Sequence, residues 1–182
     1  MIQTNQSTKM VYTEEMLTQL CKELTEEYWN MGFDIPVVIG QLDCKTLAQF
    51  EATETEPYDI VFNESLIYNL ELTEIIPLIK HELVHYANFM RGLPRNDWDD
   101  EFLQELARVD GGLYIDDRIT TLKYGDEVHI VVCKNCMKNY AFFSSKQKYK
   151  EKANQRTYCC YAKPHYLWAK KILPPRKPQS EN

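Results

Sequence analysis

The sequence has no apolar run that approaches the roughly 20 residues needed to cross a bilayer, which argues against a membrane-spanning protein. Its first residues, MIQTNQSTKMVYTEEM, are polar and lack the apolar core of a secretory signal peptide. No internal repeat is present. We therefore expect a cytoplasmic protein without a membrane partner, and the length of 182 residues suits one domain with a small additional module.

A chain without a signal peptide is not expected to join its six cysteines in disulfides. Two of them, Cys21 and Cys44, are isolated in the sequence. The other four gather in the last third of the chain, at Cys133, Cys136, Cys159 and Cys160. Clustered cysteines in a reducing compartment indicate a metal site.

Acidic residues are scarce at the C-terminal end of the chain. Residues 133–182 contain 12 basic and 2 acidic residues, a net charge of +10, whereas residues 1–132 contain 9 basic and 25 acidic residues, a net charge of −16. Aromatic residues such as Tyr158 and Trp168 are interleaved with the basic ones. This combination favours binding of nucleic acid through phosphate neutralisation and base stacking, with a merely solvated basic surface as the alternative.

The periodicity of apolar residues predicts an α+β fold. Helices are expected over 13–31, 72–92 and 97–112, and strands over 35–40, 45–52, 58–63 and 127–133. Thr13 is the expected cap of the first helix, whose apolar stripe comprises Met16, Leu17, Leu20, Leu24 and Tyr28. We expect a body over 1–125, a small β module over 126–173 and a disordered tail over 174–182.

The stretch LIKHELVHYANFM carries two histidines four residues apart, with a glutamate after the first. On a helix, His81 and His85 lie on one face and can present two imidazole nitrogens to one zinc ion. Glu82 is one position round, where a general base can take a proton from water. The alternative is a helix with two hydrogen-bonded core histidines and an exposed Glu82.

A catalytic zinc ion takes three protein ligands and keeps one position open, so a third ligand is needed. The two remaining histidines lie in or beside the cysteine cluster, which leaves carboxylates of the segment RNDWDDEFLQEL. Asp97 is the favoured candidate, with Asp99, Asp100 and Glu101 as alternatives. Asp97 is also a good helix N-cap, and acidic residues in a first turn offset the helix dipole.

The segment VVCKNCMKNYAFF predicts a strand, a C-x-x-C knuckle and a second strand. A further pair of cysteines follows about 22 residues later, which fits a structural zinc ribbon. Cys133 and Cys136 are the clear ligands, whereas the second half is irregular. There the candidate ligands are Cys159, Cys160 and His165, and a ribbon that has lost its metal is the alternative.

The order of these features resembles the SprT-like family of zinc metallopeptidases, which includes bacterial SprT-like proteins and the Spartan-type proteases of DNA–protein crosslinks. The resemblance is carried by the N-terminal helix, KTLAQF, DIVFNESLI, HELVHY, DDEFLQEL and the C-terminal cysteines, over about residues 13–165. It implies a zincin-like body with a zinc-ribbon-like module. It further implies one catalytic Zn²⁺ and a second, structural Zn²⁺.

The resemblance implies hydrolysis of peptide bonds in a protein or peptide substrate by Glu82-assisted attack of zinc-bound water. DNA is the expected partner of the basic C-terminal module. The family's third ligand is normally a histidine four or five residues before the aromatic residue of the next helix, here Phe102, and those positions hold Trp98 and Asp97. The alternative function is that of a catalytically inactive, nucleic-acid-binding member of the family.

Overall fold

The computed structural model describes residues 11–115, 118–133, 139–145 and 166–172, which form a mixed α+β fold with four helices and two small mixed sheets. This architecture confirms the predicted α+β class. The chain divides into two compact units, Met1–Ile75 and Ile76–Asn182. None of the helices in the described part combines the length and apolar composition of a membrane span.

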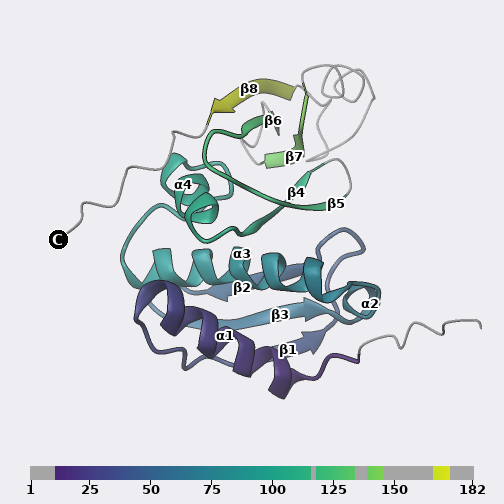
Figure 1. The fold of residues 1–182 in the computed structure, drawn as a ribbon, viewed down its shortest axis with the longest axis vertical. Coiled ribbons are helices and arrows are strands. Elements are labelled where there is room, and N and C mark those ends of the chain that lie inside the picture. Colours follow the sequence, from purple (N-terminus) through teal and green to yellow (C-terminus); the bar gives the residue numbers. More distant parts are fainter. Residues whose placement is uncertain (1–10, 116–117, 134–138, 146–165, 173–182) are drawn as a thin grey trace, which may run out of the picture. The chain divides into compact units, whose positions relative to one another are not determined.

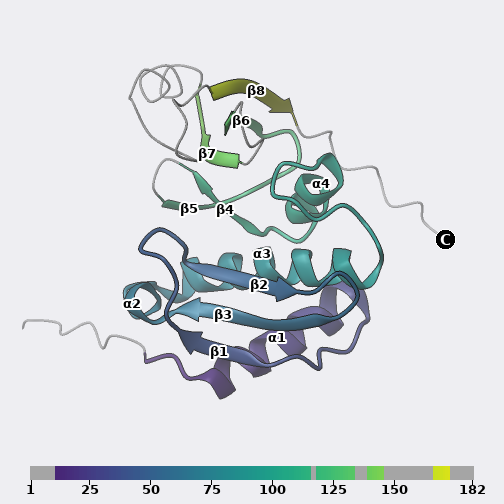
Figure 2. The ribbon, with the colours of Figure 1, turned by 180° about the vertical axis from the view of Figure 1, so that it is seen from behind.

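The first unit contains a three-stranded sheet with β3 at its centre, in the order β1-β3-β2. Strand β1 runs parallel to β3, and β2 runs antiparallel to it, so that Val38 and Gln49 both pair with Val61. Helix α1 lies on one face of the sheet, in front of it in Figure 1 and behind it in Figure 2. The elements of this unit are α1 (Glu14–Trp29), β1 (Val37–Gly40), β2 (Ala48–Ala52), β3 (Pro57–Asn63) and α2 (Glu64–Ile67).

Helix α1 begins where the sequence predicts, because Thr13 accepts a hydrogen bond from the backbone N–H of Met16. The predicted apolar stripe is partly wrong. The buried residues of α1 are Leu17, Cys21 and Thr25, whereas Met16 is exposed. A small hydroxyl side chain can be buried on a helix because it bonds a carbonyl of the preceding turn, and Thr25 Oγ1 donates to Cys21 O over 2.6 Å.

The second unit contains a five-stranded sheet in the order β5-β4-β7-β6-β8. Strand β6 pairs antiparallel with both β7 and β8, and β4 joins β7 in a parallel pair at Ile115 and Phe142. The remaining elements, labelled in Figure 1, are α3 (Leu72–Met90), α4 (Asp100–Arg108), β4 (Gly112–Ile115), β5 (Arg118–Thr121), β6 (Glu127–Cys133), β7 (Asn139–Phe143) and β8 (Tyr166–Ile172).

The strands of this sheet come from both sides of residue 125, since β4 and β5 precede it and β6 to β8 follow it. The two-domain organisation with a boundary near residue 125 stays a prediction. Strands β4, β5 and β8 are not among the strands that the sequence predicts. The expected tail, 174–182, lies outside the described residues.

Helix α4 is shorter than predicted and begins at Asp100, with Asp99 at the N-cap position. The Asp99 carboxylate does not cap the helix, because it accepts hydrogen bonds from the backbone and side-chain N–H groups of Asn96 instead. This leaves Asp97 in the turn before α4.

Two polar contacts fix α4 against α3. Lys80 is buried on α3 and donates a hydrogen bond over 2.7 Å to the carbonyl of Val109, the C-cap residue of α4. Glu105 of α4 forms ion pairs with Arg91, just beyond α3, and with Arg108 of its own helix. The apolar residues Phe102, Leu106 and Val109 of this segment are buried.

The buried side chain of Asn63 forms three hydrogen bonds within the first unit. Its Nδ2 donates to the carbonyls of Asp43 and Thr46, and its Oδ1 caps α2 at Ser65 N. We expect Asn63→Ala to lower the free energy of unfolding by about 1–3 kcal/mol, because these buried groups lose their partners. Urea denaturation should show this loss, and Gln49→Ala, at an exposed position of β2, should stay within about 0.5 kcal/mol of the unmodified chain.

Candidate metal centre

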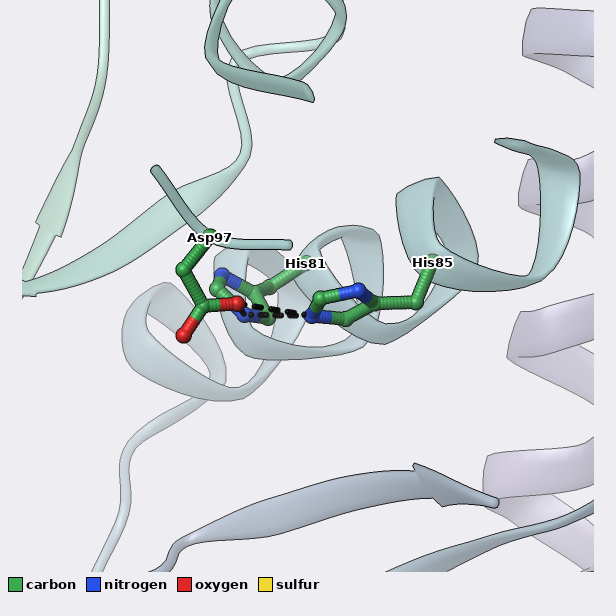
Figure 3. A group of neighbouring side chains, drawn as sticks. All are labelled: His81, His85 and Asp97. Atoms are coloured by element: carbon green, nitrogen blue, oxygen red, sulfur yellow. Dashed lines mark hydrogen bonds and ion pairs between the residues drawn. The ribbon is translucent and has the colours of Figure 1, made fainter. Parts of the chain in front are cut away.

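The site is built on two histidines of helix α3. His81 and His85 are four residues apart, so their side chains project from the same face one turn apart. Their ring centroids are 4.9 Å apart, and the two Nε2 atoms lie 3.1 Å from each other. Figure 3 shows both Nε2 atoms pointing toward the same point as a carboxylate oxygen of Asp97.

The other ring nitrogen of each histidine contacts a main-chain carbonyl. His81 Nδ1 lies 2.8 Å from the oxygen of Gly112, and His85 Nδ1 lies 2.7 Å from the oxygen of Arg95. Because a carbonyl oxygen only accepts hydrogen bonds, each Nδ1 carries the hydrogen and donates it. In the neutral ring, the lone pair is therefore on Nε2. This is the tautomer that a metal ligand requires.

Asp97 brings a carboxylate to the same point. Its Oδ1 lies 3.0 Å from His85 Nε2 and 3.5 Å from His81 Nε2. The turn that carries Asp97 is closed by the hydrogen bonds from Asn96 to the Asp99 carboxylate, and Asp99 N also donates to Asn96 O. The alternative role of Asp97 as the helix N-cap is wrong, because Asp99 occupies that position.

Three acceptor atoms that face one another at about 3 Å require a cation between them, either a proton or a metal ion. Burial opposes protonation of His81. The hydrogen bond to Asp97, the charges of Glu82 and Asp97 and the hydrogen bond to Gly112 outweigh it and raise the pKa of His81 to about 9. For Asp97, burial works against ionisation, but hydrogen bonds from both histidines hold the pKa of its carboxyl well below its usual value.

The same donor atoms fit a divalent metal ion. In a tetrahedral zinc site with ligand distances of about 2.0–2.1 Å, donor atoms lie about 3.3–3.4 Å apart. The three separations in this group, 3.0, 3.1 and 3.5 Å, bracket that value. Two imidazoles and a carboxylate are also a ligand set of catalytic zinc sites, which keep a fourth position for water or substrate. Among the described residues, His81, His85 and Asp97 are the group that could hold a metal ion.

Glu82 follows the first histidine and is buried, with 3 % of its surface exposed. Its negative charge contributes to the raised pKa of His81, so the carboxylate stabilises a positive charge on that ring. Glu82 is thus a buried carboxylate that follows a candidate metal ligand in the sequence, and a carboxylate is a residue type that can serve as a general base.

An aromatic ring from α4 holds both imidazoles in place. Phe102 is fully buried, and its centroid lies 5.2 Å from that of His81 and 4.4 Å from that of His85. The ring meets His81 edge-on and His85 at a tilt, so it restricts the rotation of both. In the sequence, Phe102 is only an aromatic residue of the predicted helix, and nothing there indicates its contact with the two imidazoles.

The loop between α3 and α4 is tied to the helix by a side chain that the sequence analysis did not single out. Asn88 is buried on α3, and its side-chain Nδ2 donates a hydrogen bond to the carbonyl of Pro94 over 2.7 Å. The main-chain carbonyl of Asn88 accepts a second hydrogen bond, from Leu93 N. Pro94 immediately precedes Arg95, whose carbonyl holds His85. The sequence could have indicated this role, because Asn88 is a polar residue about one turn after His85 on the buried face of the helix.

The other candidate ligands have different surroundings. The Asp99 carboxylate is engaged by Asn96, and Asp100 and Glu101 are exposed in the first turn of α4. Cys133 ends strand β6, opposite Tyr166 of β8. The remaining predicted zinc-ribbon ligands, Cys136, Cys159, Cys160 and His165, lie outside the described residues, and the structural zinc site stays a prediction. Of the two isolated cysteines, Cys21 is buried and Cys44 is exposed.

Comparisons with known proteins do not add to this geometry. No model of a known protein family, no curated protein and no solved structure matches the chain. The functional argument therefore depends on the residues of the site itself.

The raised pKa of His81 predicts how the stability of the metal-free protein depends on pH. A histidine whose folded pKa of about 9 exceeds its unfolded value of 6.5 stabilises the fold fully below pH 6.5 and loses that contribution as the pH rises to about 9. Urea denaturation of chelator-treated protein should show a fall in unfolding free energy over this range. Asp97→Asn should reduce the fall, whereas Asp100→Asn, at an exposed position, should leave it in place.

A metal ion bound by this group would have to displace the proton that the raised pKa of His81 favours. We expect the affinity for Zn²⁺ to rise by up to about tenfold per pH unit between pH 6.5 and 9, with release of up to one proton from His81 per ion. Calorimetric titration in buffers of different ionisation enthalpy measures this release. An affinity that is independent of pH in this window would show that the ion binds elsewhere.

Proposed function

We propose that this protein is a zinc-dependent metallopeptidase, with His81, His85 and Asp97 as the metal ligands and Glu82 as the catalytic base. The observation that supports the proposal most directly is the convergence of two Nε2 atoms and one carboxylate oxygen within 3.5 Å of one another. The proposal agrees with the resemblance of the sequence to SprT-like metallopeptidases.

The donor atoms alone do not define the reaction, because two histidines and one carboxylate also hold iron in non-haem oxygenases. Glu82 favours hydrolysis. A metal site that only binds a cofactor or oxygen has no need of a second carboxylate beside its ligands, and Glu82 supplies one that is buried. Zinc is the ion that unites this ligand set with peptide hydrolysis.

A zinc ion held by His81, His85 and Asp97 would supply a Lewis acid that polarises the scissile carbonyl and lowers the pKa of water. Glu82 accepts a proton from the water whose oxygen attacks the carbonyl carbon. It then donates that proton to the amide nitrogen as the C–N bond breaks, so that the products are a carboxylic acid and an amine. His81 and His85 keep their Nδ1 hydrogens on Gly112 O and Arg95 O throughout, which leaves both Nε2 atoms available to the metal.

The substrate is proposed to be a protein or peptide, with DNA-associated proteins as one class. The DNA component depends on the basic residues of 133–182, most of which lie outside the described part of the chain. The pair Lys170 and Lys171 falls on strand β8. DNA binding through this segment should weaken steeply with added salt, because phosphate contacts release counterions.

The proposal predicts that Glu82→Gln separates metal binding from catalysis. Glutamine preserves the shape of the side chain but cannot take up a proton, so hydrolysis of an unfolded protein should fall by at least about 100-fold. The zinc content should stay at that of the unmodified protein. Cleavage is followed by fluorescence release from a labelled unfolded protein, with and without DNA, and zinc by elemental analysis.

Glu101→Gln is the matched control, because Glu101 is an exposed glutamate in the first turn of α4. It should retain full activity and zinc. Equal cleavage by the unmodified protein and Glu82→Gln would exclude Glu82 as the base. Zinc-loaded protein that cleaves nothing, but binds DNA in a salt-dependent manner, would favour the inactive nucleic-acid-binding alternative.

A further inference from the structure

Gly112 is the first residue of strand β4 and also the residue whose carbonyl contacts His81. Its oxygen lies 2.8 Å from His81 Nδ1, while its backbone pairs with Thr121 of β5. One residue thus belongs both to the start of a hairpin and to the surroundings of a proposed metal ligand.

There is no space for a side chain at this position. A Cβ atom on Gly112 would lie 2.9 Å from Pro77 Cβ, 3.1 Å from the Pro77 backbone carbon and 2.7 Å from Ile119 Cγ2. The isoleucine side chain can change its rotamer, but Pro77 has a rigid ring and lies inside helix α3, one turn before His81. Any side chain at 112 therefore pushes β4 away from α3 at this place.

We infer that Gly112 is a positioning residue of the metal centre. Its lack of a side chain allows β4 to approach α3 at Pro77, and this approach brings the Gly112 carbonyl within hydrogen-bond distance of His81 Nδ1. The inference rests on the proposed function, because it assigns the role to a ligand of the proposed zinc ion.

The distances explain why a small displacement matters. Ordinary contact between two carbon atoms begins at about 3.5 Å, so an alanine at 112 has to move by roughly 0.5 Å from Pro77. A hydrogen bond of 2.8 Å that lengthens by that amount passes the limit of about 3.2 Å for N–H···O bonds. His81 then loses the acceptor that keeps its hydrogen on Nδ1 and its lone pair on Nε2.

The second histidine provides an internal reference. His85 Nδ1 donates to Arg95 O, which lies in a loop held by Asn88 and has no contact with Gly112 among those described. A change at 112 should therefore affect the Nδ1–H group of His81 and leave that of His85 as it was. A general loss of stability would affect both.

The test compares Gly112→Ala with the unmodified chain, using Zn²⁺ alone as the probe. Zinc affinity, measured by competition with a chromophoric chelator, should fall by about 10–100-fold, the usual effect of losing a partner that orients a metal ligand. In nitrogen-edited NMR spectra of the zinc-loaded protein, the exchange-protected Nδ1–H signal of His81 should disappear while that of His85 remains. A folded Gly112→Ala protein with zinc affinity within about twofold of the unmodified chain would overturn the inference.

Two further variants distinguish the contact with Pro77 from the contact with Ile119 and from the general effect of a glycine-to-alanine change. Gly40→Ala is the matched control, since a Cβ at Gly40 meets its nearest neighbour at an ordinary 3.4 Å, and it should retain zinc affinity. The double variant Gly112→Ala, Ile119→Ala removes the contact with Ile119 but keeps the one with Pro77. It should bind zinc as weakly as Gly112→Ala, whereas Ile119→Ala alone should not. Full recovery in the double variant would contradict the role assigned to the approach at Pro77.

The unmodified protein alone also tests the inference if the variants do not fold. Its His81 Nδ1–H group must show protection from exchange, and an unprotected signal would overturn the assignment. If the chain binds no zinc, the proposed function fails. The positioning can still be measured on the metal-free protein, because the protection of the His81 Nδ1–H group by Gly112 O does not require a metal ion.

Discussion

Two hydrogen bonds from imidazole Nδ1 atoms to main-chain carbonyls determine what the site of this protein can do. They place the lone pairs of His81 and His85 on the nitrogens that face each other at 3.1 Å. Each acceptor comes from a different segment, Arg95 from the loop after α3 and Gly112 from the start of β4. The site therefore exists only when helix, loop and hairpin are assembled together, and the Lys80 contact to α4 belongs to that assembly.

The charges around the two rings make the proton and a metal ion competitors for one position. Asp97 and Glu82 favour a positive charge at His81 strongly enough to overcome its burial. A site with such a field holds a proton when no metal is present and gives it up when a divalent ion binds. The two carboxylates stabilise the protonated state of His81, and in the proposed zinc site they would also attract the ion.

The sequence predicts well what depends on local patterns. Thr13 and the acidic turn after it locate the start of α1, and the four-residue spacing of His81 and His85 correctly predicts that their rings lie together on one face of α3. Among four acidic residues near α4, it favoured Asp97 without being able to exclude the others, because the choice depends on which one caps the helix. The main-chain carbonyls that accept from the two histidines could not be predicted, because every residue has such a carbonyl. Gly112 is the last residue of a predicted helix, whereas in the structure it begins β4 and lets that strand approach Pro77.

The contact at Arg95 has a consequence for how this protein can vary over evolution. His85 is oriented by the main-chain oxygen of residue 95, not by its side chain, and the Arg95 guanidinium instead lies over the ring of Phe89, 4.7 Å from its centroid. Nearly any amino acid could provide the same oxygen while Asn88 anchors the preceding carbonyl. The side chain at position 95 can therefore change in charge and shape while the main-chain acceptor that orients His85 stays in place.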